Sequence, residues 1–319
     1  MKRAEDRHVP VLFQEVLDSL QLKPGMTVVD CTLGMGGHSE GILRRLGPTG
    51  HLIAFDRDPE ALALARERLE GVREELGSEA PKLTLIGEAF SSIASHVGAA
   101  TLDGILADFG VSSLQLDEAR RGFSFRADGP LDMRMDTRSG LTAEQVVNEA
   151  DERELANLIY EYGEERRSRR IARAIVRGRP IATTGELAQL VAAAAPAMKQ
   201  EKIHPATRTF QALRIYVNRE LGEISDLLAK APKLLKVGGR LAVISFHSLE
   251  DRIAKDSLRD GAHEGIWELI SRKPIVAGEE ETDRNPRSRS AKLRVAERIV
   301  PGTAKKYRKK WDEGLGKMR

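Results

Sequence analysis

The chain of 319 residues carries a net charge of only +3, with 41% hydrophobic and 31% charged residues, which is typical of a globular protein and excludes a disordered or fibrous one. Its length predicts two domains, or one large domain with an insertion. The single cysteine excludes a disulfide framework, a multi-cysteine zinc site and an iron–sulfur cluster. No stretch approaches the roughly 18 apolar residues of a membrane helix, and the N-terminus lacks the apolar region of a signal peptide. We therefore expect a cytoplasmic protein with no membrane partner.

Short apolar runs alternate with helical patterns in the first half of the chain. Four of these runs are predicted to be strands, at 27–32, 51–56, 82–86 and 102–108. After the second run, Asp58 is a typical helix N-cap and Pro59 a typical first helical residue. Strands and helices that alternate in this way predict an α/β fold, in which a parallel sheet is covered by helices on both faces.

From residue 117 to residue 213 the chain has helical patterns alone. Three pairs of residues there have the spacing of capping boxes, namely Thr142 with Gln145, Asp151 with Glu154, and Thr183 with Glu186. We therefore predict an inserted all-helical domain over 117–213, carried by a discontinuous domain made of 1–116 and 214–319.

The α/β pattern resumes after the insertion. Apolar residues at steps of three and four from Phe210 to Leu228 predict one long helix that returns the chain to the sheet. A fifth strand is expected at 240–245, after two glycines, and a final pair of strands at 266–270 and 292–299.

The sharpest local feature is the glycine-rich turn from Asp30 to His38, DCTLGMGGH, between the first strand and its helix. Glycines in this position let the backbone approach a ligand at the carboxyl edge of the sheet. Asp56 ends the second strand, 20 residues after Gly36, where a carboxylate can accept hydrogen bonds from both hydroxyls of a ribose. The pattern therefore predicts a site for an adenosine-type cofactor.

Two cofactor classes compete for this site. A dinucleotide usually needs G-x-G-x-x-G, so that its pyrophosphate meets a helix N-terminus. Here the order is G-x-G-G-H and the acidic Asp30 precedes it. A carboxylate would repel pyrophosphate but could bind the amino group of S-adenosylmethionine, whose sulfonium is also cationic. We therefore expect S-adenosylmethionine, with a nicotinamide dehydrogenase as the disfavoured alternative.

The fourth strand ends in Asp108, followed by FGVSS. Methyltransferases that act on amino groups keep a polar residue and a tight turn with an aromatic residue at this place. The exocyclic amine of a base is a poor nucleophile, and hydrogen-bond acceptors that hold its N–H groups in line with the methyl group would lower the barrier. Asp108 is the candidate for this role, and a turn cap is the alternative interpretation.

Two rival chemistries are weaker. Methylation at carbon 5 of a pyrimidine needs a cysteine nucleophile, but Cys31 lies at the end of the first strand beside the cofactor turn, where we expect it to pack in the core. His247 and Ser248 suggest a hydrolase, yet no G-x-S-x-G precedes a helix. A turn or a substrate contact is the better interpretation of that pair.

Three basic clusters stand out in this nearly neutral chain, over 164–179, 284–298 and 303–319. Such clusters are typical of a surface that follows a phosphate backbone, and the alternative is that they are only solvated faces. For the last two clusters we predict contacts with RNA; the candidate residues are Arg287, Arg289, Lys292, Lys305 and Lys306. If instead these arginines pair with the acidic run 279–283, they serve only stability.

Taken together, the motifs resemble one known family, the MraW/RsmH S-adenosylmethionine-dependent methyltransferases, which methylate N4 of a cytosine in the decoding region of small-subunit (16S) ribosomal RNA. The resemblance runs almost from end to end. It is carried by DCTLGMGGHS from Asp30, DFGVSS from Asp108, RGFSFRADGPLDMRMD from Arg121, IHPATRTFQALRIYVN from Ile203 and GGRLAVISFHSLEDR from Gly238.

The resemblance implies a Rossmann-like class I methyltransferase sheet, with the helical insertion helping to recognise the substrate. It also implies that ribosomal RNA or the assembled small subunit is the partner. The cofactor contacts that it implies are Gly36, Gly37, His38, Asp56, Phe90, Asp108 and Gln115. The alternative function is a non-catalytic ribosome-assembly factor that keeps an adenosine site.

Overall fold

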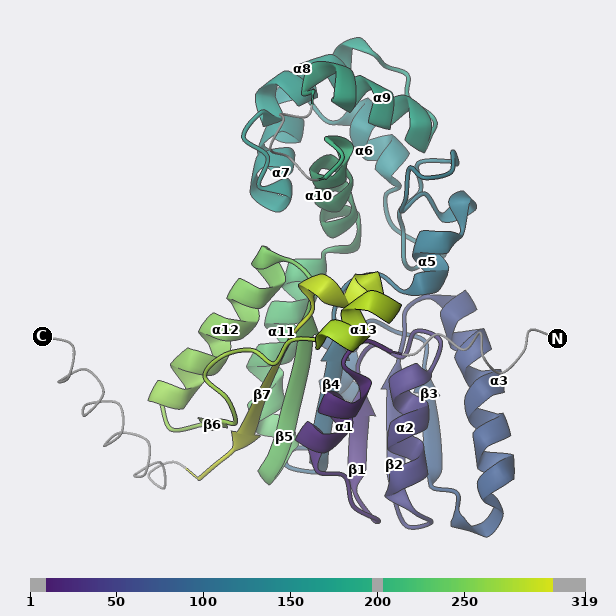
Figure 1. The fold of residues 1–319 in the computed structure, drawn as a ribbon, viewed down its shortest axis with the longest axis vertical. Coiled ribbons are helices and arrows are strands. Elements are labelled where there is room, and N and C mark those ends of the chain that lie inside the picture. The colour runs from purple at the N-terminus through teal and green to yellow at the C-terminus, as the bar shows by residue number, and fades with distance from the viewer. Residues whose placement is uncertain (1–9, 197–202, 301–319) are drawn as a thin grey trace, which may run out of the picture. The chain divides into compact units, whose positions relative to one another are not determined.

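The computed structural model describes residues 10–196 and 203–300, and its strands form one sheet of seven (Figure 1). The strands are β1 Thr27–Asp30, β2 His51–Phe55, β3 Lys82–Ile86, β4 Leu102–Asp108, β5 Leu235–Ser245, β6 Trp267–Leu269 and β7 Lys292–Arg298. Their order is β3-β2-β1-β4-β5-β7-β6. The first five are parallel, and β7 runs antiparallel to both β5 and β6. The predicted α/β class is confirmed.

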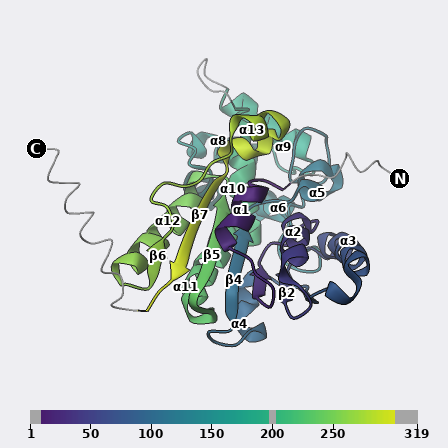
Figure 2. The ribbon, with the colours of Figure 1, turned by 60° about the horizontal axis from the view of Figure 1, so that its bottom comes forward.

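Helices cover both faces of this sheet (Figure 2). The helices outside the inserted segment are α1 Phe13–Leu20, α2 Gly37–Leu46, α3 Pro59–Leu76, α4 Ile93–His96, α11 Glu220–Leu234, α12 Ser248–His263 and α13 Glu279–Arg284. Alternate residues of each strand face opposite sides. Leu293 and Val295 of β7 pack in the core beneath α1 and α2, whereas Lys292 and Arg294 contact α12 through Asp251 on the other face. One face of the sheet is therefore covered by α1 and α2, and the other by α12.

The chain divides into two compact units. Residues Val111–Leu221 form the second unit, and the chain on either side of them forms the first. The helices of the second unit are α5 Ser113–Asp117, α6 Ala143–Glu149, α7 Glu152–Gly163, α8 Ser168–Arg177, α9 Thr184–Ala194 and α10 Ala206–Asn218. They enclose a separate hydrophobic core that includes Leu155, Ile171 and Leu187.

The second unit is wider than the predicted insertion of 117–213. At its beginning Val111 and Leu116 pack against its core, and at its end Val217 does the same. Nothing in the sequence assigns these residues to the second unit, because an apolar residue does not reveal which of two hydrophobic cores it packs in. The boundaries therefore had to come from the packing.

The single long helix predicted from Phe210 to Leu228 is wrong, because the structure has two helices there. Arg219 adopts a left-handed backbone conformation, with φ of 52°, and this ends α10. The carboxylate of Glu220 then forms a two-pronged ion pair with Arg214, with Nε–Oε1 and Nη2–Oε2 distances of 2.8 and 2.9 Å. Apolar spacing continues through both helices, so it could not reveal the break.

The other local predictions agree closely with the structure. Asp58 caps α3 by accepting from the backbone N–H of Glu60, and Thr142, Asp151 and Thr183 cap their helices in the same manner. The largest difference among the strands is in β5, which begins at Leu235 and not at residue 240, whereas β1, β2, β6 and β7 are shorter than predicted by one or two residues. Among the described residues, no helix is both long and apolar enough to cross a bilayer.

Candidate active site

The carboxyl ends of β1, β2 and β4 lie together at one edge of the sheet. In the parallel register Asp30 of β1 pairs with Ala54 on one side and with Leu106 on the other. Asp56 and Asp108 each come two residues after these partners. Three acidic side chains therefore gather at the edge where sheets of this type bind ligands.

The glycine turn connects β1 to α2 at this edge. Gly34 and Gly36 have φ of 51° and 78°, which is the left-handed region that glycine adopts at little cost. Gly37 is required for a different reason, because a Cβ there would lie 2.4 Å from Cγ of Pro10. The turn is therefore both shaped by its glycines and closed over by the segment that precedes α1.

The segment that covers the turn is held by a residue far away in the sequence. The backbone N–H of Leu12 donates to Oε1 of Glu281 on α13 over 2.8 Å, and Leu12 itself is fully buried in a left-handed conformation, with φ of 53°. Glu281 belongs to the acidic run that could have neutralised the basic loop. In the structure it anchors Leu12 instead.

Asp56 lies beside the glycine turn and is held by two backbone groups. Its Oδ2 accepts from Gly34 N–H and its Oδ1 from Asp58 N–H, both over 2.8 Å. Burial raises the pKa of Asp56 to about 7, against the lowering effect of these two hydrogen bonds. Each carboxylate oxygen has a second lone pair, so Asp56 can still accept from the hydroxyls of a ribose.

Asp30 has a structural role that its charge did not predict. Its side chain is fully buried, accepting from Ser39 Oγ over 2.7 Å and from Thr32 N–H over 3.0 Å. Burial raises the pKa of Asp30, and the hydrogen bond from Ser39 partly offsets this rise. The carboxylate of Asp30 therefore ties the turn to α2, and its binding of the amino group of a cofactor stays a prediction.

Asp108 is the most distinctive group at this edge. Its backbone N–H donates to Thr32 Oγ1 over 2.7 Å, while its Oδ2 lies 3.7 Å from Nε2 of His38. Its buried Oδ1 has no hydrogen-bond partner within the described part of the chain. Burial, together with the charges of Asp30 and Glu250, raises the pKa of Asp108 well above its usual range. A buried oxygen of this kind calls for a donor from a ligand.

Aromatic rings lie next to both His38 and Asp108. The ring of His38 stacks on Phe13, with centroids 5.9 Å apart. On the other side Phe90 lies 6.2 Å from Phe109, which directly follows Asp108. The residue after Phe90 is held by α11, because Ser91 N–H donates to Glu223 and Ser91 O accepts from Lys230. The structure thus brings His38, Asp56, Phe90 and Asp108 to one edge of the first unit.

Gln115 differs from the other predicted cofactor residues, because it belongs to the second unit. It lies on α5 and is almost fully buried. Its side chain and the hydroxyl of Ser112 form a reciprocal capping box, in which Ser112 N–H donates to Gln115 Oε1 over 3.0 Å. A contact between Gln115 and the cofactor stays a prediction.

Sequence reasoning missed a charged network that supports the glycine turn. Arg68 of α3 donates from Nε to Glu40 Oε2 over 2.8 Å and from Nη1 to the carbonyl of Met35 over 3.3 Å. Burial alone would raise the pKa of Glu40, but hydrogen bonds from Arg68 and Arg44 bring it below its usual value. The i, i+4 spacing of Glu40 and Arg44 was readable in the sequence, whereas the contact with Arg68 was not.

Neither rival chemistry finds support at this edge. Cys31 is buried, and burial together with the charge of Asp30 raises the pKa of its thiol well above the usual value. A thiol that does not ionise is a poor nucleophile. Nε2 of His247 lies 3.0 Å from Oε1 of Glu250 at the start of α12, which makes this histidine part of a helix cap.

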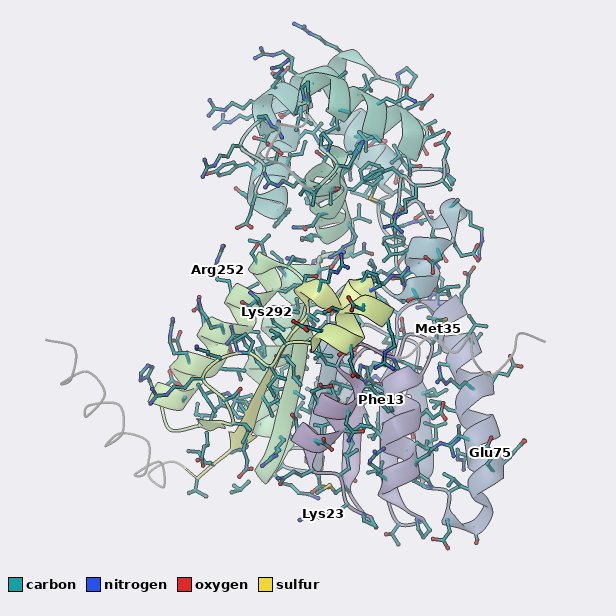
Figure 3. All side chains as sticks on the ribbon, viewed as in Figure 1. Phe13, Lys23, Met35, Glu75, Arg252 and Lys292 are labelled. Atoms are coloured by element: carbon teal, nitrogen blue, oxygen red, sulfur yellow. The ribbon has the colours of Figure 1, made fainter. Side chains whose placement is uncertain are left out.

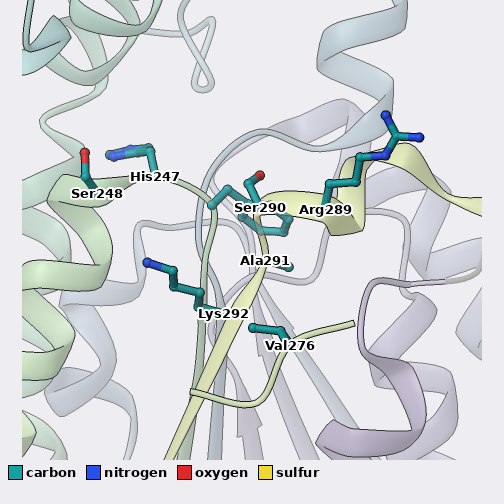
Figure 4. Close-up of a pocket in the computed structure, with 8 residues that line it drawn as sticks. His247, Ser248, Val276, Arg289, Ser290, Ala291 and Lys292 are labelled. Carbon is teal, nitrogen blue, oxygen red and sulfur yellow. The ribbon is translucent and has the colours of Figure 1, made fainter. Parts of the chain in front are cut away.

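Two of the predicted RNA-binding residues, Arg289 and Lys292, line a small cavity of about 240 Å³ next to α12 (Figure 4), whereas Arg287 does not. The amine of Lys292 lies 3.0 Å from Asp251. Arg289 is exposed, extends away from His247 in Figure 4, and has no hydrogen bond or ion pair with another described residue. The proposed pairing with 279–283 is therefore absent for Arg289 among those residues. Lys305 and Lys306 lie outside the described residues.

Comparison with known proteins decides the family. The family model described as the MraW methylase family matches residues 5–299. The chain belongs to this family. The protein named ribosomal RNA small subunit methyltransferase H from Acidobacterium capsulatum is 68% identical over 293 residues, which cover 92% of this chain and 99% of that protein. The protein of the same name from Koribacter versatilis is 60% identical over 293 residues, covering 91% and 94%.

This MraW family member is an S-adenosylmethionine-dependent methyltransferase, as its motifs indicate, and its family membership excludes the dehydrogenase alternative. Among solved structures it is similar to an S-adenosylmethionine-dependent O-methyltransferase from Thermotoga maritima, with 12% identity, a TM-score of 0.43, and coverage of 92% of this chain and 68% of that one. The residues present fit the cofactor, since each oxygen of Asp56 keeps a lone pair for a ribose hydroxyl beside the glycine turn.

Proposed function

We propose that this enzyme transfers a methyl group from S-adenosylmethionine to the exocyclic N4 amine of a cytosine in the decoding region of small-subunit (16S) ribosomal RNA. The names of the two relatives support ribosomal RNA as the substrate. The observation that carries the choice of an amine is Asp108, whose buried Oδ1 has no hydrogen-bond partner among the described residues. Such an oxygen suits a donor N–H, which an exocyclic amine has and ring carbon 5 lacks.

The bound cofactor would supply an electrophilic methyl group. Asp108 would then have two tasks. It accepts a hydrogen bond from the amine, which orients the nitrogen lone pair, and it takes the proton that the nitrogen releases when the new N–C bond forms. A carboxylate with a raised pKa is a stronger base than an ordinary aspartate, so burial prepares Asp108 for the second task. His38, 3.7 Å away, would position the carboxylate.

For the cofactor itself we assign the adenosine side to the glycine turn and to Asp56. Gly36 and Gly37 let the backbone come close to the ligand, and Asp56 accepts from the ribose hydroxyls. His38, Phe90, Asp108 and Gln115 complete the proposed contacts. The geometry above supports the first-unit members of this set, and Gln115 rests on the resemblance of its motif alone.

For the RNA we assign the loop that carries Arg287, Arg289 and Lys292, together with Lys305 and Lys306 beyond the described residues. The exposed Arg289, which lacks an ion pair among the described residues, supports this assignment most directly. The helical second unit would contribute to substrate recognition. Either free ribosomal RNA or the assembled small subunit could be the partner, and both place the reaction in the cytoplasm.

One experiment tests this function against its alternatives. The protein is incubated with labelled S-adenosylmethionine and small ribosomal subunits that lack the modification, and the RNA is then digested to nucleosides. We expect label in N4-methylcytidine. Label in 5-methylcytidine would contradict the role of Asp108, and binding to the subunit without any transfer of label would favour the assembly factor.

A further inference from the structure

The helix α8 carries the most one-sided charge of the second unit. Ile171, Ala172 and Ile175 face the hydrophobic core of the unit and are buried. The opposite side of the helix and the residue before its N-cap present five exposed arginines, which are Arg166, Arg169, Arg170, Arg173 and Arg177. Nitrogen-tipped side chains project outward around α7 and α8 in Figure 3.

These arginines are little neutralised by the protein itself. Arg173 lies 3.4 Å from Glu152 of the neighbouring α7. The nearby Glu165 is engaged elsewhere, because its carboxylate is buried between Arg167 and Arg208. The other four exposed arginines, Arg166, Arg169, Arg170 and Arg177, have no side-chain hydrogen bond or ion pair with another described residue. Four cations on this surface thus lack an internal partner in the described chain.

The local electrostatics of α8 oppose this arrangement. The first turn of the helix has no acidic residue but contains Arg169 and Arg170, although the N-terminus of a helix favours negative charge. Arg169 and Arg173, and again Arg173 and Arg177, are like-charged neighbours at i, i+4, which destabilises a helix. Residues that conflict with their own element are often kept for function. The exposed arginines of α8 are therefore suited to binding an anionic partner outside the protein.

We propose that the exposed arginine face of α8 is a docking surface for the phosphate backbone of ribosomal RNA. This inference rests on the proposed function, and it adds a second RNA contact to the loop around Arg289. Guanidinium groups fit phosphate by paired hydrogen bonds. From Arg169 to Arg177 the helix rises about 12 Å, a length over which several phosphates can be contacted. The helix has no aromatic residue that could stack on bases. The contact is therefore with the charged phosphates and does not depend on the base sequence.

The test compares two variants with the same loss of charge. The first is the triple variant Arg169→Gln, Arg170→Gln and Arg177→Gln. The control is Lys23→Gln, Arg66→Gln and Lys82→Gln, which removes three exposed cations of the first unit. Lys23 lies just before β1, and Lys82 is the first residue of β3. Both are therefore at the amino ends of parallel strands, the edge of the sheet opposite Asp108. Binding to a naked small-subunit ribosomal RNA transcript is measured from about 50 to 200 mM salt.

We expect the α8 variant to lose affinity by roughly tenfold or more at the lower salt concentrations, and to flatten the log–log salt slope by about 2 units, since each phosphate contact contributes about 0.7 to 0.9. The control should keep the slope of the wild type. The α8 variant should also unfold at the same temperature as the wild type or a higher one, because like-charge repulsion is relieved. A loss of RNA binding would then not reflect unfolding.

The outcomes separate this inference from the proposed function. If the wild type methylates the subunit while the α8 variant keeps the wild-type slope, the docking surface is refuted and the function stands. If the slope depends on α8 but no methyl group is transferred, the docking surface is supported and the function fails. If the variant binds naked RNA normally and loses only the assembled subunit, the partner of α8 is an acidic protein surface and the RNA proposal is overturned.

Discussion

Nε2 of His38 lies 3.7 Å from Oδ2 of Asp108, and the ring of Phe13 stacks against the imidazole. This distance is longer than a hydrogen bond, so the pair is close but not locked together. The carboxylate keeps its buried Oδ1 without a hydrogen-bond partner among the described residues. A substrate N–H can therefore be accommodated without breaking an existing hydrogen bond of Asp108 Oδ1.

The first prediction concerns Asp108. Asp108→Ala should lower the turnover number by about a hundredfold or more, because the variant can neither orient the amine nor accept its proton. Turnover is measured with saturating cofactor on small subunits that lack the modification, so that any loss of cofactor affinity is excluded. Wild-type turnover in this variant would reduce Asp108 to a cofactor contact or a turn cap.

The second prediction concerns Asp56. Asp56→Ala should weaken S-adenosylmethionine binding by roughly tenfold to a hundredfold, the loss of about 1.5 to 3 kcal/mol that follows removal of a charged acceptor. Calorimetric titration measures the affinity. Asp103→Ala is the control, since it removes a carboxylate near the beginning of β4, at the opposite edge of the sheet. Equal affinity in the wild type and Asp56→Ala would remove Asp56 from the cofactor site.

The raised pKa of Asp56 also predicts a pH dependence. The native carboxyl has a pKa of about 7 against 3.8 without perturbation, so between these values the native protein holds a proton that the unfolded chain has released. The contribution of Asp56 to stability without cofactor therefore falls as the pH rises from about 4 to 7. Cofactor affinity should change in the opposite direction, rising toward pH 7, because the ionised form is the better acceptor. Both trends should be absent from Asp56→Ala.

The third prediction uses two glycines of neighbouring helices. Gly37→Ala places a Cβ 2.4 Å from Pro10, and should cost about 1 to 3 kcal/mol of stability as an overpacked site. Gly71→Ala on α3 meets nothing within 4 Å, and should stabilise the protein by about 0.5 to 1 kcal/mol, as alanine does inside a helix. Thermal unfolding should therefore shift in opposite directions. Shifts of the same sign would show that Pro10 does not explain Gly37.

The fourth prediction concerns the basic loop after α13. Replacing both Arg287 and Arg289 by glutamine should weaken binding to ribosomal RNA and reduce the log–log salt slope by about one unit for each phosphate group that the variant no longer binds. The affinity for S-adenosylmethionine should stay unchanged in the same preparation. A lower unfolding temperature combined with an unchanged salt slope would show instead that the two arginines serve stability alone.

Much of the first unit could be predicted from its sequence, because its signals are local. β3 and β4 were expected at the residues where they occur, since each is a short apolar run between polar turns. The glycine turn and Asp56 were recognisable by their spacing. The cap at Asp58 follows from the chemistry of its own side chain and the proline after it.

The errors arose where the decisive contact is distant or depends on the backbone. Nothing in the sequence marks Arg219 for a left-handed conformation, which residues other than glycine adopt rarely. The charge of Asp30 suggested a ligand contact, and nothing in the sequence revealed that Ser39, nine residues later, donates a hydrogen bond to that buried carboxylate. Gly37 must be a glycine because a Cβ there would clash with Pro10, a residue that lies outside the glycine-rich motif in the sequence.

The hydrogen bond from Leu12 to Glu281 joins segments 269 residues apart, and it bears on the order in which the protein matures during its synthesis. The glycine turn lies between β1 and α2, yet the segment that closes over it is anchored by α13, a helix that is synthesised long after the turn. Contacts of such long range form late, because the intervening chain must first be ordered. A nascent chain that has not yet reached Glu281 therefore carries every glycine of the turn but lacks the hydrogen bond that anchors its cover, which can form only after α13 has been synthesised.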